Sequence, residues 1–172
     1  MKVTEKQIAK WIESYLNSKY ANMVLTRNLD RMLIHKLQCD RRDEFGVRVS
    51  VRWKEFIKEN ISVFENYNDF ESIHDKVAEF SKQFFGIGDL TIYDTATCIG
   101  CPKGVFPKVV YMHLGTQEGA NALGVTGSTA EKKQFVAKCK DFKKLEPIQI
   151  EDFLCIYKNQ LHGKTIELPK GC

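Results

Sequence analysis

The fold is decided by the stretch Phe84-Phe85-Gly86-Ile87-Gly88-Asp89-Leu90, which places a Gly-Ile-Gly turn between two segments with helical periodicity. Asp69 is expected to cap the helix before the turn, and the helix after it is expected to end near Gly100. A helix that begins directly after Gly-x-Gly leaves its first backbone N–H groups uncovered, together with the positive end of its dipole. This arrangement predicts an anion-binding turn at Gly86-Ile87-Gly88.

Apolar residues recur at three- and four-residue steps through most of the chain, which predicts helices. Capping boxes are expected at Thr4-Glu5-Lys6-Gln7 and at Ser128-Thr129-Ala130-Glu131. Further helices are predicted over about 21–39, from Ser50 to about 66, over about 116–123 and from Ile150 to Leu161. Val109-Val110-Tyr111-Met112 fits either a buried strand or the start of a helix, and residues 40–48 form a charged loop. Seven or eight helices with no assigned strand indicate an all-α fold.

The length of 172 residues and the 43% hydrophobic content predict one compact multi-helix domain. We expect this domain to span residues 1–162, with the hairpin at about 70–100 and a flexible tail at 163–172. Six scattered cysteines without a secretory signal favour the reducing cytoplasm, and no apolar run has transmembrane length. Neither a cofactor nor a membrane partner is expected.

Lys and Arg exceed Asp and Glu by 26 to 22, so the net charge is only +4 and local clusters matter more than the total. Two clusters stand out: Arg41, Arg42, Arg48, Arg52 and Lys54, and Lys132, Lys133, Lys138, Lys140, Lys143 and Lys144. Such clusters give affinity for nucleic-acid phosphates that is independent of sequence and sensitive to salt. A solvated polar face is an equally good interpretation of the lysine cluster.

The succession of helix, Gly-Ile-Gly and helix resembles the helix-hairpin-helix motif over Phe84 to Gly100. In that family the hairpin glycines place backbone N–H groups on a DNA phosphate without reading the bases. The resemblance implies a protein that binds duplex or distorted DNA through backbone phosphates. The implied contact residues are Gly86, Ile87, Gly88, Lys82, Lys103, Arg41 and Arg42.

An all-α domain with such a hairpin is also similar to the base-excision DNA glycosylase superfamily. Val109 stands where that superfamily places its catalytic aspartate, and Leu90 stands where its bifunctional members place a lysine. Valine and leucine supply neither a carboxylate nor an amine, so the resemblance favours a non-catalytic, glycosylase-like DNA-binding domain. The alternative is a glycosylase with a relocated carboxylate, for which Asp94 and Glu118 are the candidates, and His113 is a further candidate catalytic residue.

Purely structural roles are alternative interpretations of the same residues. Asp94 fits a structural hydrogen bond from the hairpin to a neighbouring loop, and the hairpin itself fits a purely structural connection in a protein-interaction domain. The single Cys98-Ile99-Gly100-Cys101 pair has no second pair at short spacing, so no metal site is expected. Sequence blocks in the second half of the chain, such as Val110 to Thr116, are similar to uncharacterised bacterial proteins and imply no activity.

Overall fold

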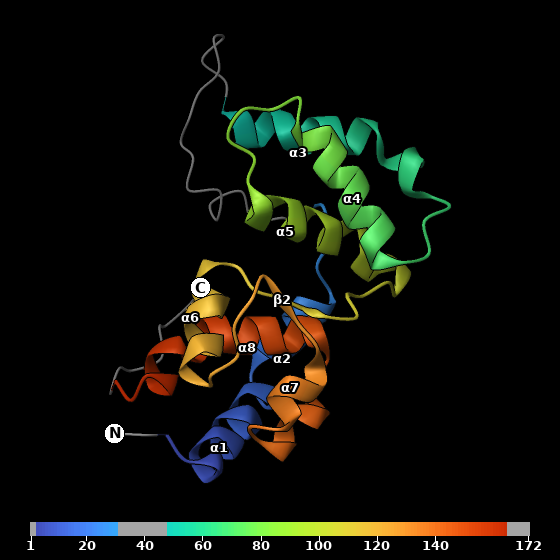
Figure 1. Cartoon of the computed structure of the whole chain (residues 1–172). Coiled ribbons are helices and arrows are strands. Elements are labelled where there is room, and N and C mark those ends of the chain that lie inside the picture. Colours follow the sequence, from blue (N-terminus) through green and yellow to red (C-terminus); the bar gives the residue numbers. More distant parts are fainter. Residues whose placement is uncertain (1–2, 31–47, 165–172) are drawn as a thin grey trace. The chain divides into compact units, whose positions relative to one another are not determined.

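The computed structural model describes residues 3–30 and 48–164, and helices α1 to α8 account for most of them, which confirms the all-α prediction (Figure 1). Arg41, Arg42, most of the predicted charged loop and the tail from 165 lie outside the described residues. The helix predicted over 21–39 is wrong beyond Leu25, because the helix ends there and residues 26–30 are not helical, while residues 31–39 lie outside the described part of the chain. No helix in the described ranges has the length and apolar character needed to cross a membrane.

The chain forms two compact units, although its length and composition predicted one domain over residues 1–162. Unit 1 contains residues 1–25 and 108–172, and unit 2 contains residues 26–107. Figure 1 makes this visible by colour, because the blue N-terminal helices share unit 1 with the yellow to red C-terminal part. Unit 2 is therefore an insertion in the sequence of unit 1, and each unit is described by itself.

Unit 1 is built around helix α8 (Pro147–Leu161). Its other elements, with η for a 3-10 helix, are α1 (Glu5–Leu16), α2 (Lys19–Leu25), β1 (Val110–Tyr111), α6 (Leu114–Ala122), β2 (Thr129–Ala130), α7 (Lys132–Val136) and η4 (Lys140–Lys144). The predicted capping box of Thr4 and Gln7 is confirmed. The one predicted at Ser128 to Glu131 is wrong, because Thr129–Ala130 pairs with β1 as a short antiparallel strand. Glu131 and Gln134 form the capping box of α7 instead.

Helices α6 and α8 approach each other closely because α6 carries glycines on the facing side. A Cβ atom added to Gly119 would lie 2.4 Å from the backbone oxygen of Leu154, and one added to Gly115 would lie 2.9 Å from the sulfur of Cys155. Phe153 of α8 anchors the core, where its ring packs edge-on against Phe142 at 5.5 Å. The α6–α8 pair is therefore fixed by backbone contact as well as by apolar burial.

Unit 2 contains α3 (Val49–Glu59), η2 (Ile61–Phe64), α4 (Phe70–Ser81), α5 (Asp89–Gly100) and η3 (Cys101–Lys103). The predicted N-cap of α4 is confirmed, since the Asp69 carboxylate accepts a hydrogen bond from the Ser72 backbone N–H at 2.8 Å. Helix α5 ends at Gly100 as predicted. Helices α4 and α5 pack against each other, and residues 82–88 connect them.

Candidate nucleic-acid interface

The connection between α4 and α5 is anchored by Phe84. Its ring packs edge-on against Trp53 at 5.2 Å and against Phe56 at 5.1 Å, and both partners belong to α3. Gly86 has a φ of 93°, which lies in the left-handed region that favours glycine. The backbone conformation therefore explains Gly86.

Gly88 has no such explanation. Its φ of −105° and ψ of 178° suit any residue, and a Cβ atom added there would have no neighbour within 4 Å in the part of the chain that the structure describes. It is the N-cap of α5, a position that glycine also occupies readily, but where Ser, Asp and Asn add a side chain that accepts hydrogen bonds from the first turn. The fold does not require glycine at this position, and the space in front of it is open.

The first turn of α5 consequently offers backbone donors. No side chain of residues 3–30 or 48–164 caps the helix, and its first internal hydrogen bond runs from the Ile92 N–H to the Gly88 carbonyl oxygen at 3.0 Å. Within the described residues, the N–H groups of Asp89 and Leu90 have no acceptor. Together with the positive end of the dipole of a twelve-residue helix, they can bind an anion.

The surface of the turn combines apolar and charged side chains. Phe85 is 82% exposed and Leu90 is 43% exposed, which are high values for large apolar residues, whereas Ile87 is half-buried. Lys82 is exposed at the end of α4, but the exposed carboxylate of Asp89 lies in the first turn of α5 and opposes a bound anion. Neutral backbone donors, rather than net charge, are thus the principal anion-binding feature here.

Three other residues were predicted to contact phosphate: Lys103, Arg41 and Arg42. Lys103 donates hydrogen bonds from Nζ to the backbone oxygens of Phe64, Glu65 and Tyr67, at 2.7, 3.1 and 2.6 Å. Since an ammonium group has three protons, Lys103 is fully engaged in holding this loop. The guanidinium groups of Arg41 and Arg42 lie outside the described residues.

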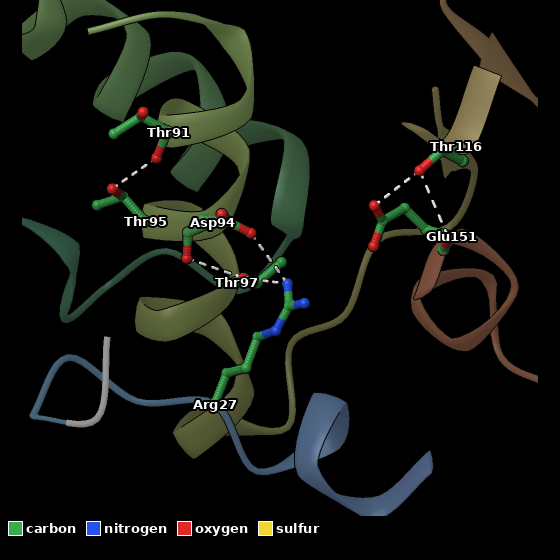
Figure 2. Close-up of polar contacts among 7 residues, drawn as sticks. All are labelled: Arg27, Thr91, Asp94, Thr95, Thr97, Thr116 and Glu151. Carbon is green, nitrogen blue, oxygen red and sulfur yellow. Dashed lines mark hydrogen bonds and ion pairs between the residues drawn. The ribbon is translucent and has the colours of Figure 1, made fainter. Parts of the chain in front are cut away.

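Asp94 takes a structural position on α5. Its carboxylate forms an ion pair with Nη1 of Arg27 at 3.2 Å, and the same nitrogen lies 3.4 Å from the Thr97 hydroxyl (Figure 2). This contact ties the second hairpin helix to the segment that follows α2. It agrees with the structural interpretation of Asp94, a contact from the hairpin to a neighbouring loop. Arg27 as its partner was not foreseen, because the two residues are 67 positions apart.

The other two candidate catalytic residues lie in unit 1. His113 is the half-buried N-cap of α6, and its ring stacks on Tyr111 at 6.4 Å. Glu118 is exposed and forms an ion pair with Lys158 at 2.9 Å, and the hydrogen bond and charge of that lysine lower the pKa of the carboxyl. A surface carboxylate held in its ionised form is poorly suited to donate a proton at neutral pH.

The Cys-x-x-Cys pair is buried at the end of α5. Burial raises the pKa of the Cys98 thiol to about 12 and that of the Cys101 thiol to about 11, so both are protonated at neutral pH. Metal ligation and nucleophilic chemistry need the thiolate. Within residues 3–30 and 48–164, no group of three or more His, Cys, Asp and Glu side chains could hold a metal ion.

A buried polar pair in unit 1 was missed at the level of sequence. The Thr116 hydroxyl donates to Oε1 of Glu151 at 2.9 Å, and the two residues are 1% and 6% exposed (Figure 2). The available signal was an acidic residue among the apolar positions Ile150, Phe153 and Leu154 of α8. Because the carboxylate meets a hydroxyl between two packed helices, this pair is a structural feature of the α6–α8 contact.

Comparison of the chain with known protein families, with curated proteins and with solved structures finds no match.

Proposed function

We propose that this protein binds nucleic acid, with DNA as the first candidate, by placing a backbone phosphate against the first turn of α5. The observation that carries the proposal is Gly88: a glycine that the backbone does not need, with open space in front of it, at the start of an uncapped helix. A phosphate oxygen that approaches the Asp89 and Leu90 N–H groups needs this space. Binding of this kind reads no bases and is weakly selective for sequence.

The exposed ring of Phe85 fits the same proposal. It directly precedes the turn glycines and is 82% exposed, and exposed aromatic rings are groups on which a base that has left the helical stack can lie. This supports distorted duplexes as preferred ligands over regular ones. The protein then acts as a non-catalytic binding module, since nothing in the arrangement of Asp94, His113 and Glu118 favours a reaction. The cytoplasm is the compartment that agrees with this role.

The test uses one variant in which stability and DNA binding are expected to change in different directions, together with a matched control. Gly88→Asp adds a side chain that caps α5, so we expect its melting temperature to stay the same or rise. The added carboxylate occupies the phosphate position, so we expect affinity for a duplex of about 20 base pairs to fall about thirtyfold, as for loss of a charge-assisted hydrogen bond of about 2 kcal/mol. Fluorescence anisotropy with labelled DNA measures this.

Asn66→Asp is the matched control, because it adds the same charge to an exposed loop position of unit 2 outside the turn. We expect this variant to bind within about twofold of the wild type. Equal affinities of the wild type and Gly88→Asp, or no binding of any DNA or RNA by the wild type at low salt, would refute the proposed function.

A further inference from the structure

The charges of the chain are unequally divided between its two units. Unit 2, which carries the hairpin, has 12 Lys and Arg against 13 Asp and Glu, whereas unit 1 has 14 against 9. The basic excess of the whole protein therefore belongs to unit 1. A polyanion is attracted chiefly by net positive charge, so the hairpin unit alone gives little electrostatic attraction.

Much of the excess in unit 1 lies in one short segment, from Lys132 to Leu145. Its apolar residues Phe135, Cys139, Phe142 and Leu145 are at most 1% exposed, and the rings of Phe135 and Phe142 pack at 5.7 Å. These four residues fix the backbone of α7 and η4 to the core. The lysines between them consequently project from a rigid support.

This support is also fastened to α1. The Lys140 backbone N–H donates to Oε1 of Glu5 at 3.2 Å, and the Cys139 thiol lies 3.8 Å from the Glu5 carbonyl oxygen. Lys140 and Lys143 are three residues apart in the 3-10 helix η4, which has three residues per turn, so they project from the same side.

Three lysines of this segment keep their charge available. Lys133 pairs with Glu131 at 2.6 Å and Lys144 pairs with Asp141 at 2.8 Å. Lys138, Lys140 and Lys143 are exposed, and no described acidic side chain forms an ion pair with them. We call these three residues the lysine ridge.

We propose that the lysine ridge is a second nucleic-acid contact surface, which binds backbone phosphates and supplies the salt-sensitive part of the affinity. The choice of nucleic acid as the partner rests on the proposed function of the hairpin. An anionic membrane is less favoured, because Phe135, Phe142 and Leu145 of the segment are fully buried and cannot insert into lipid.

The test compares the salt dependence of DNA binding by the full chain and by the triple variant Lys138→Gln, Lys140→Gln, Lys143→Gln. Each phosphate contact to duplex DNA contributes about 0.9 to the slope of log affinity against log salt, so the slope should fall by about 2.7. The side chains of these lysines are exposed, so the variant keeps its fold, which circular dichroism checks. A triple variant of Lys19, Lys108 and Lys164 to Gln, spread over other parts of unit 1, is the control and should keep the wild-type slope.

Lysine acetylation of the wild type, mapped by mass spectrometry, gives a second readout. Bound DNA should protect Lys138, Lys140 and Lys143 and leave Lys19, Lys108 and Lys164 reactive. Equal slopes for the ridge and control variants, with no protection of the ridge, would overturn the proposal. So would a loss in the ridge variant confined to phosphatidylserine vesicles.

The two proposals fail separately. If Gly88→Asp binds like the wild type while the ridge variant loses its salt slope, the hairpin proposal is wrong and the ridge proposal stands. If Gly88→Asp loses affinity while the ridge variant keeps its slope, the reverse holds.

Discussion

Helix α6 of unit 1 and the connection between α4 and α5 of unit 2 each contain two closely spaced glycines, but these glycines are there for different physical reasons. Gly115 and Gly119 lie under the partner helix, where an added Cβ would meet a side-chain sulfur and a backbone oxygen within 3 Å. Gly86 has a positive φ, whereas a Cβ atom added to Gly88 would have no described atom within 4 Å. The comparison separates glycines that packing or conformation requires from one that neither requires, and the latter is the candidate for function.

The largest effect is expected where packing requires glycine. Gly119→Ala would place its Cβ 2.4 Å from the Leu154 carbonyl oxygen, so α6 and α8 must separate. We expect a loss of about 3 kcal/mol in the free energy of unfolding, as for severe overpacking. Urea denaturation followed by circular dichroism measures it. Gly88→Ser is the counterpart in unit 2 and should change stability by only a few tenths of a kcal/mol. Similar losses in both variants would contradict the distinction between the glycines.

The next effect concerns the buried polar pair between the same two helices. Thr116→Val removes the hydroxyl that donates to the Glu151 carboxylate at 2.9 Å while preserving the shape of the side chain. We expect a loss of about 1 kcal/mol in the free energy of unfolding, in the range for an intramolecular hydrogen bond. Thr116→Ser keeps the hydroxyl and serves as the control. If Thr116→Val and Thr116→Ser lower the free energy of unfolding equally, the hydrogen bond adds no stability beyond packing.

Alkaline pH should weaken unit 2 through its buried thiols. The folded pKa values of Cys98 and Cys101, about 12 and about 11, lie above the ordinary value of 9.0. Above pH 9 the unfolded chain therefore releases protons that the folded chain keeps, and stability falls as pH rises toward 11. The expected loss is about 1 kcal/mol per pH unit for each thiol. Thermal melts of the wild type and of Cys98→Ala between these pH values measure it; a steeper fall in the variant would contradict the assignment.

The smallest effect is expected at the ion pair of α5. Asp94→Asn weakens the ion pair with Arg27. The side chains of Arg27 and Asp94 are 18% and 22% exposed, so we expect the free energy of unfolding to fall by at most about 1 kcal/mol. DNA affinity should stay unchanged. Incubation of the wild type with duplexes that carry alkylated, oxidised or deaminated bases should yield no abasic product. Product that disappears in Asp94→Asn would restore the glycosylase alternative.

Local signals predicted the presence of most helices but not all of their bounds, since α2 ends at Leu25 and α3 at Glu59. They did not predict the long-range pairings. Thr4 and Asp69 were identified as caps because a capping side chain and the backbone N–H that donates to it are neighbours in sequence. The division into two units was not predicted, because Leu25 and Lys108 carry no linker signal and only the fold brings the two ends of unit 1 together. Strand pairing at Thr129–Ala130 overrode a plausible capping sequence for the same reason.

The candidate site was predictable only in part. The sequence identified Gly86 and Gly88, but it could not tell which of them the backbone requires, since that depends on φ. It also counted Lys103 among the phosphate contacts, whereas three carbonyl oxygens more than 30 residues away engage its ammonium group. Burial of Glu151 depends on the same kind of distant packing.

The most direct measurement is the response of the backbone amides at the start of α5 to a short DNA duplex, followed by nitrogen-15 NMR on the full chain. A phosphate that accepts from this turn predicts the largest shifts at the Asp89 and Leu90 amides, with downfield proton shifts typical of a new hydrogen bond to an anion. The same titration of Gly88→Asp should leave these amides unmoved. Binding of the wild type with shifts confined to other residues would contradict the claim that the hairpin is a phosphate site.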